Sequence, residues 1–176
     1  MIRYAITDSK YYSKEYLKNL DNKADFVLLR DKTTNSYKNL AKEFIDTTKN
    51  CSYKKIIHQD YNLAKELDAY GVHLTSLQFK DIQKAKELNL FTIISTHSIN
   101  EIKLAKKLGA DAVTFSPIFK TPNKGEPKGL KVLKEAIECC NIRVIALGGI
   151  ITTEHIKKIE ATSAWGFASI RYFIKG

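Results

Sequence analysis

The sequence predicts an α/β fold, a minimal (β/α)8 TIM barrel that lacks its last helix, on three observations. Short apolar runs alternate with amphipathic helical stripes along the chain, which is typical of parallel βα units. The junctions from helix to strand recur in similar form, as Ala24-Asp-Phe-Val, Ala69-Tyr-Gly-Val, Ala110-Asp-Ala-Val and Ala164-Trp-Gly-Phe. The chain has 176 residues and ends soon after the eighth run, so we expect one domain, residues 1–176.

Eight runs are predicted to be strands. Most lack an alternation of polar and apolar residues, which is the pattern of strands covered on both faces in a parallel sheet. The runs are Ile2–Thr7, Asp25–Arg30, Lys55–His58, Gly71–Leu74, Phe91–Ser95, Ala112–Phe115, Arg143–Leu147 and Gly166–Ile170.

Amphipathic helices are predicted between these strands. Apolar residues recur at helical spacing over Tyr37–Thr48 and again over Leu130–Cys140. Ser98-Ile-Asn-Glu101 is a capping box that predicts where the helix after the fifth strand begins. Strands and helices therefore alternate with the right-handed crossovers that build a barrel.

Composition limits the function classes. The formal net charge of +10 is first explained by a lysine-rich solvated surface, and its field also suits an anionic small-molecule ligand. No basic stripe interleaved with aromatic residues is present, so nucleic acid is not an expected partner. Without an apolar run of about 20 residues or a signal-peptide pattern, we expect a cytoplasmic protein without membrane contact. Cys51, Cys139 and Cys140 have no Cys-x-x-Cys spacing, which argues against a zinc site or a redox pair.

Candidate site residues follow the predicted strands, where barrels carry their active sites. After the seventh strand, Gly148 and Gly149 let backbone N–H groups approach an anion, and a helix starting near Thr152 points its positive end there. His58 and His97 are candidate proton carriers, because imidazole titrates near neutral pH. Each candidate also has a structural interpretation, as a loop cation, a packed histidine or a plain turn. The other residues of this set are Asp8, Arg30, Lys32, Gln59, Asp60, His73, Thr75, Ser95, Ser116 to Lys124, Ser169 and Arg171.

These segments resemble those of the thiamine phosphate synthase/TenI family of small barrels over nearly the whole chain. The resemblance implies an enzyme of thiamine biosynthesis or salvage that binds a thiazole phosphate or thiamine phosphate. It also implies that Arg30, Lys32, Thr121 and Lys124 bind a diphosphate, whereas Gly149, Ile170 and Arg171 hold the thiazole phosphate. The motifs that carry the resemblance are Leu29-Arg-Asp-Lys32, Gly71-Val-His-Leu74, Ser95-Thr-His97, Pro117-Ile-Phe-Lys-Thr121 with Lys124, and Gly148-Gly149-Ile150.

The chain departs from the synthase pattern at the metal site. The family's synthase joins a pyrimidine diphosphate to a thiazole phosphate with Mg²⁺, which an Asp after strand three and an Asp after strand four hold. Gln59 and Gln78 stand at these positions, with Asp60 as the nearest substitute, and an amide brings no negative charge to Mg²⁺. Leu28 and Thr75-Ser76 replace glutamine-containing segments of the family. We therefore expect no cofactor, and Mg²⁺ only if the chain is a synthase.

TenI-like members also lack both acidic ligands and tautomerise a thiazole carboxylate phosphate without a metal. This reaction is our first hypothesis, with His97 as first and His58 as second choice of proton carrier, because the usual catalytic histidine corresponds to Pro117. His73 is a further candidate proton carrier, with a position in a packed layer as the alternative because it lies within the strand-four motif. Two alternatives stay open: a synthase that displaces diphosphate, and a non-catalytic protein that binds a phosphorylated ligand.

The predicted absence of an eighth helix leaves apolar surface beside the first and eighth strands. The C-terminal residues Tyr172, Phe173 and Ile174 are themselves apolar. Burying a few hundred Å² at about 25 cal/mol per Å² stabilises by several kcal/mol. We therefore expect either a homodimer or a C-terminal tail folded over the gap.

Overall fold

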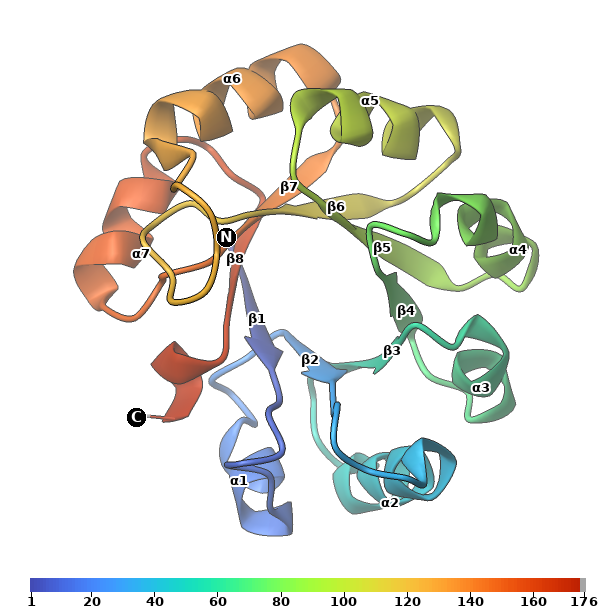
Figure 1. Ribbon diagram of the computed structural model, residues 1–176. Coiled ribbons are helices and arrows are strands. Elements are labelled where there is room, and N and C mark those ends of the chain that lie inside the picture. The colour runs from blue at the N-terminus through green and yellow to red at the C-terminus, as the bar shows by residue number, and fades with distance from the viewer. Residues whose placement is uncertain (175–176) are drawn as a thin grey trace.

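Eight parallel strands close into a barrel in chain order, and β8 pairs with β1 (Figure 1). The computed structural model describes residues 1–174. The predicted barrel is confirmed, although several strands are shorter than predicted, so that Thr7, Arg30 and Ile170 lie in loops. The strands are β1 Ile2–Ile6, β2 Phe26–Leu29, β3 Lys54–His58, β4 Gly71–Leu74, β5 Phe91–Thr96, β6 Ala112–Phe115, β7 Arg143–Leu147 and β8 Gly166–Ser169.

Helices surround the barrel on its outside (Figure 1). The two predicted apolar stripes face the strands: α2 buries Ala41 and Phe44, and α6 buries Leu133 and Ala136. The α-helices are α1 Lys14–Asn19, α2 Tyr37–Thr48, α3 Tyr61–Glu66, α4 Ile82–Glu87, α5 Ile99–Lys107, α6 Gly129–Cys140 and α7 Thr153–Glu160, and the 3-10 helices are η1 Phe79–Asp81 and η2 Arg171–Ile174.

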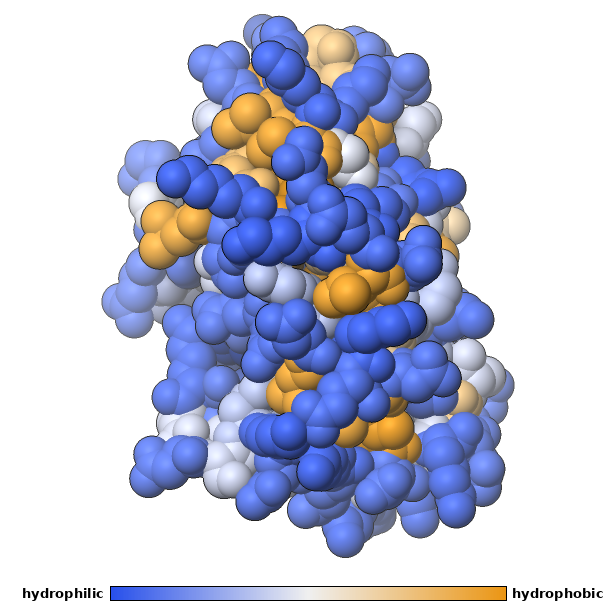
Figure 2. Space-filling view, turned by 90° about the vertical axis from the view of Figure 1, so that its right-hand side faces the viewer, coloured by the Kyte–Doolittle hydropathy of each residue, from blue (hydrophilic) through white to orange (hydrophobic). Residues whose placement is uncertain are grey.

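The apolar core has two layers. One fills the barrel interior and includes Tyr4, Phe26, Ile56 and Ile145. The other lies between the strands and the helices, and is larger. Side chains on one strand therefore alternate between the two layers, which explains why the strands are apolar on both faces. Outside this core, the flank at the right of Figure 1 is mostly hydrophilic, with apolar residues in small groups (Figure 2).

The short helix η2 follows β8 where a complete barrel has an eighth α-helix. No eighth α-helix occurs within residues 1–174, as predicted. The ring of Phe173 on η2 stacks on Phe167 of β8, with ring centroids 5.9 Å apart and planes at 5°. Figure 1 shows η2 in the gap between α7 and α1. The predicted tail thus covers the gap within one chain. The homodimer stays a prediction.

No helix within the described part of the chain is long and apolar enough to cross a membrane.

Candidate active site

A cavity of about 640 Å³ opens at the C-terminal ends of the strands. The loops after most strands contribute to its wall, so residues far apart in sequence meet there. All ten residues predicted from the sequence for catalysis or substrate binding line it: Arg30, Lys32, His58, His97, Thr121, Lys124, Gly148, Gly149, Ile170 and Arg171. Their roles stay predictions, but their convergence on one cavity supports a common site.

The cavity wall carries a strong positive charge. Arg30, Lys32, Lys124 and Arg171 line it, and Asp8 is the only acidic residue among the lining residues. The end of β2 is held to β1, because the Thr7 hydroxyl accepts from the Arg30 N–H at 2.8 Å and lies 3.1 Å from the Arg30 carbonyl oxygen. This charge distribution suits a ligand with one or more anionic groups.

Gly148 and Gly149 are required by the packing of two loops. Both have positive φ, +99° and +70°, and a Cβ on Gly149 would lie 2.7 Å from the Lys120 carbonyl oxygen. The loop after β6 packs onto the pair, with the Phe119 N–H donating to the Gly148 carbonyl at 3.0 Å. The sequence argument attributed these glycines to an anion or to a plain turn. The structure adds close contact between the loops.

Backbone N–H groups at the ends of β7 and β8 can bind a phosphate. Among residues 1–174, the N–H groups of Gly149 and Ile170 have no backbone or side-chain acceptor. Helix α7 starts nearby, and Thr152 caps it by accepting from the His155 N–H. A phosphate after strands seven and eight, near a helix N-terminus, is a common feature of TIM barrels.

His58 is a neutral and weakly basic residue. Burial, together with the positive charges of Arg30 and Lys32, lowers its pKa to about 4. At pH 7 its imidazole can hydrogen-bond a ligand but takes up a proton poorly. His58 therefore fits the role of a proton carrier less well than the sequence argument assumed.

His97 lines the cavity, and its ring nitrogen Nδ1 contacts Ser116. Its Nδ1 lies 3.2 Å from the Ser116 carbonyl oxygen and 3.3 Å from the Ser116 hydroxyl. The carbonyl only accepts, so the shorter contact favours the tautomer with hydrogen on Nδ1 and a lone pair on Nε2. The predicted capping box is present in altered form. Ser98 accepts from the Glu101 N–H, while the Glu101 carboxylate accepts from the His97 N–H rather than that of Ser98. This carboxylate fixes the His97 backbone.

The residues at the family's metal positions do not fit Mg²⁺. The Gln78 amide oxygen accepts from the Thr75 N–H at 3.1 Å, and the Asp60 carboxylate caps α3 by accepting from the Leu63 N–H at 2.8 Å. Only Gln59 of these positions lines the cavity. Among residues 1–174, no group of three or more His, Cys, Asp or Glu is placed to hold a metal ion.

Several lining residues were missed by the sequence argument. Tyr11 reaches the cavity from the loop after β1, where nothing in the sequence marks its direction. The apolar ones carry the same pattern as buried strand residues, so only the strand ends in three dimensions identify them. They are Ile6, Leu147, Ile151 and Ala168.

A closed parallel barrel with a cationic cavity at its strand ends places the chain among the (β/α)8 barrels, in which a phosphate site at this end is frequent. The chain belongs to the thiamine monophosphate synthase family, whose sequence profile matches residues 3–173. It is 40% identical to a protein of Aquifex aeolicus provisionally named thiamine-phosphate synthase 2, over 98% of this chain and 97% of that one. It is 30% identical to the thiamine-phosphate synthase of Clostridium novyi, over 98% and 90% of the two chains.

A solved structure supports the same family. The thiamine phosphate pyrophosphorylase of Pyrococcus furiosus superposes with a TM-score of 0.81 at 26% identity, over 95% of this chain and 84% of that one. The family and fold expected from the sequence motifs are therefore confirmed.

Proposed function

We propose that this chain acts in thiamine metabolism as a metal-independent tautomerase of a thiazole carboxylate phosphate. One observation carries the proposal: Gln78 and Asp60 are engaged in bonds within the chain and Gln59 brings no charge, while the His97 ring lines the cationic cavity with Nδ1 beside Ser116. A tautomerase needs a proton carrier and an anion site, and it needs no metal ion.

The residues divide the work between binding and proton transfer. The N–H groups of Gly149 and Ile170, with Arg171, would hold the substrate phosphate. His97 Nε2 would take the proton from one ring atom, and the resulting imidazolium would return it to another. The hydrogen bond from Nδ1 to the Ser116 carbonyl at 3.2 Å would stabilise the charged ring during this step.

The test follows the ring protons of the substrate by NMR in the presence of a chelator. We expect conversion of the non-aromatic to the aromatic thiazole carboxylate phosphate, undiminished by the chelator. Tight binding of this ligand without conversion would instead support a non-catalytic phosphate-binding protein.

A diphosphate-displacing synthase is the second candidate, because the relatives with 30% and 40% identity have synthase names. It requires Mg²⁺, so the discriminating measurement is calorimetric titration of Mg²⁺ into the protein and into Asp60→Ala. We expect no saturable millimolar binding to either. Saturable binding in the presence of a pyrimidine diphosphate, with formation of thiamine phosphate, would favour the synthase.

A further inference from the structure

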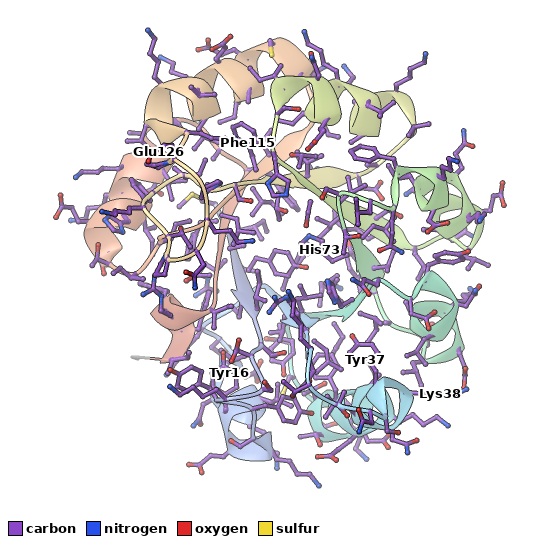
Figure 3. The ribbon with its side chains drawn as sticks, viewed as in Figure 1. Tyr16, Tyr37, Lys38, His73, Phe115 and Glu126 are labelled. Atoms are coloured by element: carbon purple, nitrogen blue, oxygen red, sulfur yellow. The ribbon has the colours of Figure 1, made fainter. Side chains whose placement is uncertain are left out.

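The barrel interior holds a histidine that the proposed chemistry does not use. His73 on β4 is 3% exposed and lies inside the ring of strands (Figure 3). Burial lowers its pKa to about 3, with smaller contributions from His58 and Arg30. The ring is therefore neutral at pH 7, and only one of its two nitrogens carries hydrogen.

Two hydroxyl groups flank this ring. Tyr4 Oη lies 2.9 Å from Nδ1, and Ser95 Oγ lies 3.0 Å from Nε2. Tyr4 is fully buried, and its hydroxyl has no other hydrogen-bond partner in the described chain. Ser95 also lines the cavity, so its hydroxyl can reach a ligand.

The direction of these bonds follows from Tyr4. If Nδ1 carried the hydrogen, the phenol hydrogen of Tyr4 would be buried without an acceptor, which is costly. Tyr4 therefore donates to Nδ1, and the ring hydrogen resides on Nε2. Ser95 Oγ accepts this hydrogen, and its own hydrogen is left to point into the cavity.

Thr114 is the competing hydroxyl. Its Oγ1 lies 3.4 Å from Nε2 and would donate to this nitrogen in the opposite tautomer. In that tautomer Nδ1 donates to Tyr4 Oη and an aliphatic hydroxyl, of Ser95 or Thr114, donates to Nε2, but the hydrogen of the buried phenol is left without an acceptor. A phenol is the stronger donor and 2.9 Å the better distance, so the tautomer with hydrogen on Nε2 is favoured.

We propose that Tyr4 and His73 are positioning residues that hold Ser95 as a hydroxyl donor to an anionic oxygen of the ligand. Ser95 lies on β5, three strands from β8 in the closed order, and so faces the part of the ligand that lies away from its phosphate. In the thiazole carboxylate phosphate, that part is the carboxylate. This last assignment rests on the proposed function.

The first test measures the tautomer without any ligand. Imidazole ¹⁵N shifts at pH 7 distinguish the two neutral forms, and we expect His73 to carry hydrogen on Nε2 in the wild type. Tyr4→Phe should shift the ring toward the Nδ1 form. The matched control is Tyr53→Phe, which removes another buried phenol, one that donates to the Leu17 carbonyl at 3.1 Å, and should leave His73 unchanged. A wild-type ring in the Nδ1 form, or no change in Tyr4→Phe, overturns the proposal.

The second test measures affinity by calorimetry for thiazole carboxylate phosphate and for the same thiazole phosphate without the carboxylate. We expect Ser95→Ala to weaken only the first ligand, by about 10- to 100-fold, the range for a hydrogen bond to a charged group. Tyr4→Phe should weaken it less, and Tyr53→Phe not at all. Equal weakening of both ligands overturns the carboxylate assignment.

The two tests separate the proposal from the proposed function. If neither ligand binds the wild type, the proposed function and the carboxylate assignment both fail. The ¹⁵N measurement still decides whether Tyr4 and His73 orient Ser95.

Discussion

The three histidines at the site differ in burial, and burial changes the chemical role that each can have. His58 and His73 are shielded from water, which lowers the pKa of each, to about 4 and about 3. His97 is exposed, and its ring contacts the Ser116 carbonyl. The two buried rings are therefore neutral hydrogen-bonding groups at pH 7, whereas the exposed His97 is the proposed proton carrier.

The buried histidines predict how stability depends on pH. Their folded pKa values lie below the value of about 6.5 in the unfolded chain, so below pH 6.5 the unfolded state binds more protons. The contribution of these histidines to the free energy of unfolding should be fully present above pH 6.5. It should decrease toward pH 4.5 by on the order of 1 kcal/mol per pH unit for each histidine. Urea unfolding at several pH values measures this. His58→Gln should reduce the slope, and a flat profile in the wild type would contradict the lowered pKa values.

Replacing His97 by asparagine should lower the rate of tautomerisation without lowering the affinity for the ligand. Asparagine keeps a hydrogen-bonding side chain but cannot carry a proton, and general acid–base catalysis contributes about 10²–10⁴-fold. We expect tautomerisation to fall by this factor while calorimetry gives an unchanged ligand affinity. If turnover is undiminished in His97→Asn and lost in His58→Asn, the role belongs to His58.

At the scale of elements, the loops after β6 and β7 form one unit. Gly148 and Gly149 contact the loop after β6, and the ring of Phe119 from this loop stacks on His155 of α7 at 4.3 Å. The proposed phosphate site is thus shaped by contacts between loops and by the helix that follows them.

Gly149→Ala should disturb this unit. The new Cβ would lie 2.7 Å from the loop backbone at a φ of +70°, so strain of about 1–3 kcal/mol is expected in the free energy of unfolding. Because the backbone N–H groups would be displaced, the variant should also bind inorganic phosphate more weakly, which calorimetry measures. Gly125→Ala is the control, because nothing lies within 4 Å of its Cβ. Equal behaviour of the two variants would show that the close contact has no energetic role.

At the scale of the whole molecule, η2 closes the side of the barrel that lacks a helix. Phe173 is 6% exposed and covers Phe167. Phe173→Ala should lower the free energy of unfolding by about 3 kcal/mol, the low end for a buried phenylalanine, since η2 is at the chain end. Urea unfolding measures this loss, and light scattering measures the oligomeric state. A variant as stable as wild type would show that Phe173 does not stabilise the barrel, and a dimer in light scattering would then be consistent with a partner subunit at the gap.

The barrel could be predicted from the sequence because strands covered on both faces are apolar throughout and alternate with amphipathic helices. The ten site residues could also be placed, because strand ends meet at one face of a barrel. The contacts that give these residues their properties could not be predicted. Tyr4 and His73 are 69 positions apart, and the packing of Gly149 against Lys120 depends on the path of two loops. The cap that Asp60 forms on α3 follows a local pattern and could have been recognised.

Closure of the sheet also concerns association with other chains. Because Ile2 pairs with Gly166, each of the eight strands has two neighbours, and no strand leaves a row of unpaired backbone groups along an open side. Loss of the last strand would open two such rows at once, on β1 and on β7. Removal of β8 would therefore create templates for intermolecular strand pairing. The segment from Gly166 onward closes the sheet as well as supplying Ile170 and Arg171 to the cavity.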